Sequence, residues 1–106
     1  MYTAIREYRM TAGSVDDLMH KVDVGIADVF ADQEGFFHYE VIDTGGGRIV
    51  SITTFADRAS AQNSNELAAD FVRNELAEFG LARTATMTGE VMVSRAGSRV
   101  LEPVHH

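Results

Sequence analysis

The chain has 106 residues, of which 45% are hydrophobic, and it carries a formal net charge of −7. This length fits one small globular domain, and nine scattered Lys and Arg residues disfavour a phosphate-backbone partner. The absence of cysteine excludes a disulfide framework, a thiolate metal site and a cysteine nucleophile. The first segment, MYTAIREYRM, carries charges where a signal peptide has an apolar core, and no apolar run has the length of a membrane span. We therefore expect a cytoplasmic protein with no membrane or nucleic-acid partner.

The first third of the chain predicts a strand followed by a helix. Residues 2–10 are rich in Tyr, Thr and Ile, which favour strands. Ser14 and Asp17 have the spacing of a capping box at the start of a helix. Gly25 lies inside the predicted helix and indicates either a close approach to the sheet or a flexible turn. Hydrophobic residues at spacings of three and four predict one buried stripe, formed by Val15, Leu18, Met19, Val22, Ile26, Val29 and Phe30.

The middle of the chain predicts a hairpin of two apolar strands with glycines at the turn. If the loop has an even number of residues, the pairing assigns every side chain to one of two faces. The first face is almost entirely apolar and suits packing beneath helices; it holds Phe37, Tyr39 and Val41 opposite Thr54, Ile52 and Val50. The second face has a polar middle, typical of a cavity wall or a wet interface; it holds Phe36, His38, Glu40 and Ile42 opposite Phe55, Thr53, Ser51 and Ile49.

The last part of the chain predicts a second helix and a final strand. Asp57 or Ser60 caps the helix at its start, and Gly80 ends it. Residues 84–95 read as a strand with a bulge or bend at Gly89. We expect a single domain over residues 1–96 and a C-terminal tail over residues 97–106, whose terminal His105 and His106 are either native or the remnant of a tag.

The predicted order is strand, helix, strand, strand, helix, strand, which indicates a sheet covered by helices on one face only. The segments IREYR, EGFFHYEVIDTGGG, SITTFADRASAQNSNELAADFVRNEL and TGEVMVSRA resemble the antibiotic biosynthesis monooxygenase-like domains of the dimeric α/β barrel superfamily. This resemblance implies an α+β, ferredoxin-like fold with an antiparallel sheet. It also implies a homodimer in which two bare sheet faces close a barrel.

The resembled family contains cofactor-independent oxygenases, haem-degrading oxygenases and members with no known reaction. The haem-degrading members are similar to one another in an Asn on the first strand, a central Trp and a His on the second helix. This chain has no Trp, and its second helix, over residues 65–79, has no His. We therefore expect no cofactor. The four His residues, two of them terminal, show no metal-ligand spacing, so no metal site is expected either.

The polar middle of the second hairpin face is one candidate catalytic site. His38 would act as a base toward a phenol or enol, and Glu40 would orient its imidazole. Ser51 and Thr53 on the opposite strand would contact the substrate, together with Phe36 and Phe55. The alternative is that these polar groups meet a partner subunit or solvent.

Arg6 and Tyr8 share one side of the first strand and form a second candidate group. A buried Arg6 would stabilise an oxyanion or a developing peroxide. The alternative is an ion pair with Glu7, Glu40 or Asp43. Tyr39, on the apolar face, is expected in the core.

Two functions follow from this sequence. The first is a cofactor-independent monooxygenase acting on an aromatic or quinol-like small molecule, with His38, Glu40, Arg6 and Tyr8 as its catalytic residues. The second is a non-catalytic dimeric module that binds a small molecule or serves in a stress response, in which the same residues only adjust the interface.

Overall fold

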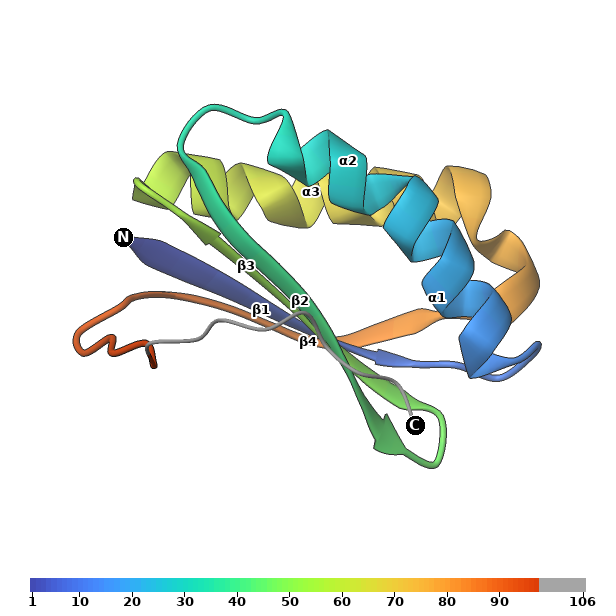
Figure 1. Cartoon of the computed structure of the whole chain (residues 1–106). Coiled ribbons are helices and arrows are strands. Elements are labelled where there is room, and N and C mark those ends of the chain that lie inside the picture. Colours follow the sequence, from blue (N-terminus) through green and yellow to red (C-terminus); the bar gives the residue numbers. More distant parts are fainter. Residues whose placement is uncertain (98–106) are drawn as a thin grey trace.

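Four antiparallel strands form one sheet in the computed structural model, which describes residues 1–97. The strands are β1 (Tyr2–Arg9), β2 (Phe36–Gly45), β3 (Arg48–Phe55) and β4 (Ala82–Glu90), in the spatial order β2-β3-β1-β4. The helices α1 (Val15–Val24), α2 (Ile26–Ala31) and α3 (Arg58–Glu75) all lie on the same side of this sheet (Figure 1). The predicted α+β, ferredoxin-like architecture is confirmed. Residues 98–106, which make up most of the predicted tail, lie outside the described residues.

Both helix starts are capped as the sequence predicts. The Ser14 hydroxyl accepts a hydrogen bond from the Asp17 amide at 3.1 Å. The Asp57 carboxylate accepts one from the Ser60 amide at 2.7 Å, so Asp57 is the cap of α3. Each cap supplies an acceptor for an amide that the first helical turn leaves unpaired.

The first predicted helix is divided in two by Gly25, which ends α1 and starts α2. A Cβ atom at this position would lie 2.5 Å from Cζ of Phe71 on α3 and 2.8 Å from the Lys21 carbonyl oxygen. The close approach expected at Gly25 therefore exists, but the neighbouring side chain comes from a helix rather than from the sheet. A residue without a side chain lets α3 pack against the break between α1 and α2.

The last part of the described chain differs from the prediction in three details. α3 stops at Glu75, and a short 3-10 turn, η1 (Ala77–Phe79), leads to Gly80, whose φ of 56° is left-handed. β4 begins at Ala82 and ends at Glu90, earlier than expected. Its irregularity lies opposite Glu7 and Tyr8 rather than at Gly89.

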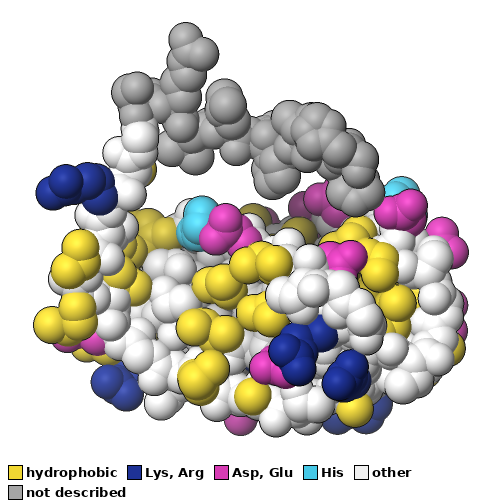
Figure 2. Space-filling model, turned by 90° about the horizontal axis from the view of Figure 1, so that it is seen from below, with side chains coloured by type: hydrophobic (Ala, Val, Ile, Leu, Met, Phe, Trp, Pro, Cys, Tyr) yellow, Lys and Arg dark blue, Asp and Glu magenta, His cyan; other side chains and the backbone are white. Residues whose placement is uncertain are grey.

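The core fills the space between the sheet and the helices. Its buried residues come from β1, β3 and all the helices, namely Tyr8, Leu18, Val22, Ile26, Phe30, Ile49, Ala68, Leu76 and Phe79. The opposite side of the sheet, called the open face below, carries no helix from residues 1–97. Figure 2 shows this side, where hydrophobic side chains gather among polar ones. The two faces therefore offer different environments to the polar residues of the strands.

Candidate functional site

The pairing of β2 with β3 decides which predicted site residues meet. Tyr39 lies opposite Thr53, and Val41 lies opposite Ser51. This register differs by one residue from the predicted one, because Thr44 forms an irregularity in β2 and Gly45 pairs with Arg48 across a two-residue turn. A shift of one residue exchanges the faces of one strand relative to the other. The predicted joint site of His38 and Glu40 with Ser51 and Thr53 is therefore wrong.

His38 and Glu40 lie on the open face. The side chains are about half exposed, at 52% and 53%, and the His38 Nδ1 atom is 3.7 Å from a Glu40 carboxylate oxygen. The prediction that His38 and Glu40 lie side by side on one face of the sheet is thus confirmed. Their neighbours across the strand are Thr54 and Ile52, not Ser51 and Thr53. The role of His38 as a base stays a prediction.

Phe36 and Phe55 lie on the helix-covered side and belong to the core at one end of the sheet. Their rings meet edge to face with centroids 5.7 Å apart. Phe55 is fully buried with Ala4 and Ala61, and Phe36 packs against this small cluster. Neither ring lines the cavity described below. Substrate contact by these two residues stays a prediction.

Arg6 lies fully buried on the helix-covered side of β1. Its Nε donates to Ser51 Oγ at 2.9 Å, and its Nη1 lies within 3.1 Å of three oxygen atoms, from Thr53, Ser64 and Asn65. All these acceptors are neutral. Among residues 1–97 Arg6 forms no ion pair, so the predicted pairing with Glu7, Glu40 or Asp43 is wrong.

Glu7 pairs instead with Arg48, whose Nε lies 3.3 Å from a Glu7 oxygen. Alternation along β1 explains this choice, because Glu7 and Arg6 point to opposite sides of the sheet. Glu40 is separated from Arg6 for the same reason, whereas Asp43 pairs with Ile49, two positions along β3 from Ser51, the partner of Arg6. The buried cation is left among hydroxyl, amide and aromatic groups.

Within residues 1–97, the remaining nitrogen of Arg6, Nη2, is buried and has no partner at full hydrogen-bond geometry, although a side-chain hydrogen bond with Tyr8 helps to raise the pKa of the guanidinium. The guanidinium lies 5.5 Å from the centre of the Phe30 ring, and it interacts electrostatically with the hydroxyls of Tyr8 and Tyr39. Burial lowers the pKa of Arg6, although a guanidinium stays charged in proteins. Burial raises the pKa of Tyr39, while the charge of Arg6 opposes that change. Tyr39 is therefore a neutral donor at physiological pH.

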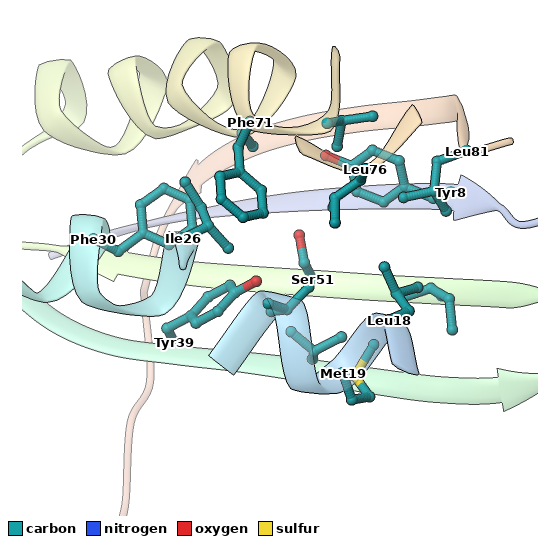
Figure 3. Close-up of a pocket in the computed structure, with 15 residues that line it drawn as sticks. Tyr8, Leu18, Met19, Ile26, Phe30, Tyr39, Ser51, Phe71, Leu76 and Leu81 are labelled. Carbon is teal, nitrogen blue, oxygen red and sulfur yellow. The ribbon is translucent and has the colours of Figure 1, made fainter. Parts of the chain in front are cut away.

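A cavity lies between the sheet and the helices beside this group. Its volume is about 40 Å³, which is room for roughly three water molecules. In Figure 3 the hydroxyls of Tyr8, Tyr39 and Ser51 point toward the middle of the cavity. Most of the remaining wall is apolar or aromatic, formed by Leu18, Met19, Val22, Ile26, Phe30, Val41, Ile49, Ala68, Phe71, Val72, Leu76 and Leu81.

Several members of this group escape prediction from the sequence. Ser64 and Asn65 look like ordinary helix-start residues, yet about two turns into α3 they accept hydrogen bonds from the guanidinium of Arg6. Arg83 on β4 donates to the Tyr8 hydroxyl at 3.2 Å and to the Asn65 carbonyl at 2.7 Å. Tyr39 was expected only as core. The alternation of side chains along β2 places Tyr39 in the cavity wall, but only once the pairing of β2 with β3 is known.

Metal-binding clusters and membrane-spanning helices are both absent from residues 1–97. No group of three or more His, Cys, Asp or Glu side chains is placed to hold a metal ion. No helix in this part of the chain is long and apolar enough to cross a membrane.

Comparisons with solved structures show the same fold at low sequence identity. HapK from Hahella chejuensis is 16% identical, with a TM-score of 0.65 over 93% of this chain and 100% of that one. A dimeric ferredoxin-like protein from an uncultured marine organism is 11% identical, with a TM-score of 0.65 over 92% and 100%. The N63A mutant of SnoaB, a cofactor-independent oxygenase from Streptomyces nogalater, is 18% identical, with a TM-score of 0.53 over 92% and 98%.

No curated protein matches the chain. The family described as antibiotic biosynthesis monooxygenase matches residues 1–72, which include β1, β2, β3 and most of α3. This range contains Arg6, Tyr8, Tyr39 and Ser51, although the match itself assigns no role to them. Because the match covers more than half of this chain, the chain belongs to the antibiotic biosynthesis monooxygenase family.

Proposed function

We propose that this protein oxidises an aromatic or quinol-like small molecule with molecular oxygen, without a cofactor, in the cavity between the sheet and the helices. The observation that carries the proposal is an apolar, aromatic-lined cavity with three hydroxyls in its lining, one of which, on Ser51, accepts a hydrogen bond from the buried guanidinium of Arg6. Apolar walls bind an aromatic ring, and a few polar groups orient it. The family match and the printed description of SnoaB as a cofactor-independent oxygenase support the reaction class.

In such a reaction the substrate supplies all the electrons. A methylene carbon between two aromatic rings, as in an anthrone, loses two hydrogens and gains one oxygen atom as a carbonyl. The second oxygen atom of O₂ leaves as water, so four electrons pass from the substrate to oxygen. A hydroquinone would give a quinone and hydrogen peroxide, with two electrons transferred. The buried positive charge of Arg6 would stabilise the negative charge that develops during either reaction.

The expectation of no cofactor stays a prediction, and the cavity walls are consistent with it. Within residues 1–97, none of the side chains that line the cavity is an imidazole, and His20, on α1, is exposed. An axial histidine is one common way to hold haem iron. The cytoplasmic location expected from the sequence is likewise part of this proposal.

We also propose that the protein is a homodimer that covers the open face. Ile42 and Met87 on this face are 43% and 58% exposed, and the dimeric ferredoxin-like protein noted above has the same fold. Met87→Lys would place a charge in the proposed interface, and we expect the dimer to weaken by about tenfold or more. Analytical ultracentrifugation measures this change. Met92→Lys, at an 80% exposed position beyond β4, is the matched control.

Oxygen consumption by the purified protein with a panel of anthrones and hydroquinones tests the proposed reaction. Ala68→Leu adds three carbon atoms to the α3 wall of the cavity, and we expect it to lower the rate by about tenfold or more. Ala69→Leu adds the same atoms to the same helix outside the lining and is expected to retain activity. Loss of activity in His38→Ala alone would place the reaction on the open face and contradict the cavity assignment.

A binding module without catalysis is the second candidate. Among residues 1–97, no Asp, Glu or His lines the cavity, so its wall offers none of the usual groups that accept a proton from a substrate. If the same aromatic compounds bind the cavity and Ala68→Leu abolishes their binding, but no compound in the panel consumes oxygen, this second function is the correct one.

A further inference from the structure

A second and larger hollow, called the end groove below, lies at one end of the molecule. Figure 1 shows the loop between α2 and β2 at the same end of the sheet as the start of α3. The end groove between them has a volume of about 270 Å³, against about 40 Å³ for the cavity. Sites for small molecules begin at about 300 Å³. Its lining differs at every residue from that of the cavity and consists of Gln33, Glu34, Phe55, Ala59, Ser60 and Asn63.

Hydrogen bonds hold the walls of the end groove in place. The Gly35 carbonyl accepts a hydrogen bond from the Ala56 amide at 2.8 Å, which joins the loop to the connection between β3 and α3. The Gln33 side chain is fixed by a bond from its Nε2 to the Val29 carbonyl at 3.0 Å. Phe55 is fully buried and closes the bottom. The end groove is therefore preformed, which lowers the entropy lost when a ligand binds.

The polar groups that the end groove offers to a ligand are mainly acceptors. Glu34 is the only charged residue of the lining, and within residues 1–97 its carboxylate has no hydrogen bond or ion pair. The Ser60 hydroxyl donates to Asp57 at 3.1 Å, so its oxygen remains an acceptor. Gln33 uses its amide nitrogen on Val29 and keeps its side-chain oxygen. The Asn63 amide adds one more acceptor and the main remaining donor.

The start of α3 does not turn the end groove into an anion site. The Asp57 carboxylate already accepts the Ser60 amide at 2.7 Å, and the Asp57 carbonyl accepts the Ala61 amide at 3.2 Å. Arg58, the one cation in this turn, lies with its guanidinium 5.1 Å from the centre of the Tyr2 ring and does not line the end groove. The local charge is therefore negative, and it favours a cation.

We propose that the end groove binds a small organic ammonium ion, with its N–H groups on the Glu34 carboxylate and the Asn63 side-chain oxygen and its hydrocarbon part against Ala59. A primary ammonium has three donors and no acceptor, which matches a lining whose free groups are mainly acceptors. This site goes beyond the proposed oxidation and has no lining residue in common with the cavity where that reaction is placed.

An NMR titration of ¹⁵N-labelled protein with butylamine at neutral pH tests the site. The neutral and anionic analogues of the same length are 1-butanol and butyrate. Butylamine is charged under these conditions, because an alkyl ammonium group such as that of lysine has a pKa of about 10.4. We expect amide resonances of residues 33–35 and 59–63 to move, with a Kd for butylamine about fivefold below that for 1-butanol. Added salt should weaken only the binding of butylamine, and butyrate should not saturate these shifts.

Two pairs of variants locate the effect. Glu34→Gln removes the charge and keeps the shape, so the affinity for butylamine should fall about fivefold while that for 1-butanol stays unchanged. Asp32→Asn removes the same charge two positions earlier, outside the lining, and is the matched control. Ala59→Leu fills the end groove and should weaken both compounds. Ala69→Leu, on the same helix outside the lining, should weaken neither.

Butyrate bound as tightly as butylamine would overturn the proposal, and so would equal losses of affinity in Glu34→Gln and Asp32→Asn. Resonance changes confined to the residues that line the cavity would overturn it as well, as would the absence of any change with butylamine. Oxygen consumption has no part in this experiment. The ammonium site and the proposed oxidation can therefore fail independently of each other.

Discussion

The helix-covered face and the open face of the sheet carry similar polar residues in opposite conditions. On the covered face, Arg6 is fully buried and donates four hydrogen bonds to side chains from β3 and α3. On the open face, His38 and Glu40 are half exposed and lie 3.7 Å apart. Electrostatic interactions are strong where water is excluded and weak where it is present. The same strands thus offer one polar group suited to holding a ligand and another that solvent screens.

The largest expected difference between the faces comes from removing an arginine on each. Arg6→Met leaves the hydroxyls of Ser51, Thr53 and Ser64 without their shared donor, so we expect a loss of about 3 kcal/mol or more in the free energy of unfolding. Urea unfolding measures it. Arg48→Met, at an exposed arginine paired with Glu7, is the matched control, with an expected loss of about 1 kcal/mol or less. Equal losses of stability in Arg6→Met and Arg48→Met would mean that the two faces of the sheet do not differ in this respect.

A second prediction concerns the tight packing above the covered face. Gly25→Ala would place a methyl group against the Phe71 ring and the Lys21 carbonyl, so we expect a loss of about 1–3 kcal/mol from overpacking. Gly89→Ala is the control, because a Cβ atom there meets no atom of residues 1–97 within 4 Å. Thermal unfolding distinguishes the two. An unchanged midpoint for Gly25→Ala would mean that the α1–α2 break adjusts without cost.

The ionisation of Tyr39 gives a third prediction, which depends on pH. Burial raises the pKa of Tyr39 in the folded protein above its unfolded value. The unfolded chain therefore loses this proton first, and stability should fall as the pH rises above about 10. The slope expected from one such group is about 1.4 kcal/mol per pH unit. Tyr39→Phe should reduce that slope in alkaline urea unfolding, whereas Tyr2→Phe should leave it intact.

The smallest expected effect on stability comes from the interaction between His38 and Glu40 on the open face. A double-mutant cycle with His38→Ala and Glu40→Ala should give a coupling of about 0.5 kcal/mol or less, because both side chains are half exposed. The coupling should also fall with added salt. A coupling of several kcal/mol would indicate that a partner subunit buries the pair, and it would make the open face the more strongly interacting of the two.

The sequence predicts the elements well, because caps and periodicity are local properties. Ser14, Asp57 and Gly80 mark helix ends where the structure has them or within a turn of them. The sidedness of the sheet follows from the order of these elements. The burial of Arg6 is also predictable, since both interpretations of that residue required it.

The site itself depends on facts that no local pattern contains. One irregular residue at Thr44 moves Ser51 and Thr53 from the His38 side to the Tyr39 side. The acceptors of Arg6 come from β3 and α3, up to 59 positions away in the chain. A side chain's alternation along its own strand is readable, whereas its neighbour on the next strand depends on the geometry of the turn.

The irregularity at Thr44 has a consequence for the history of such a domain. The turn that follows it uses Gly46 and Gly47, both with positive φ, and the Thr44 hydroxyl binds the Arg48 carbonyl oxygen at 3.1 Å. Loss or gain of one codon here would exchange which side chains of β2 meet those of β3, while composition and element order stayed the same. Descendants of one ancestral gene can therefore acquire different cavities through a single insertion or deletion at a surface turn.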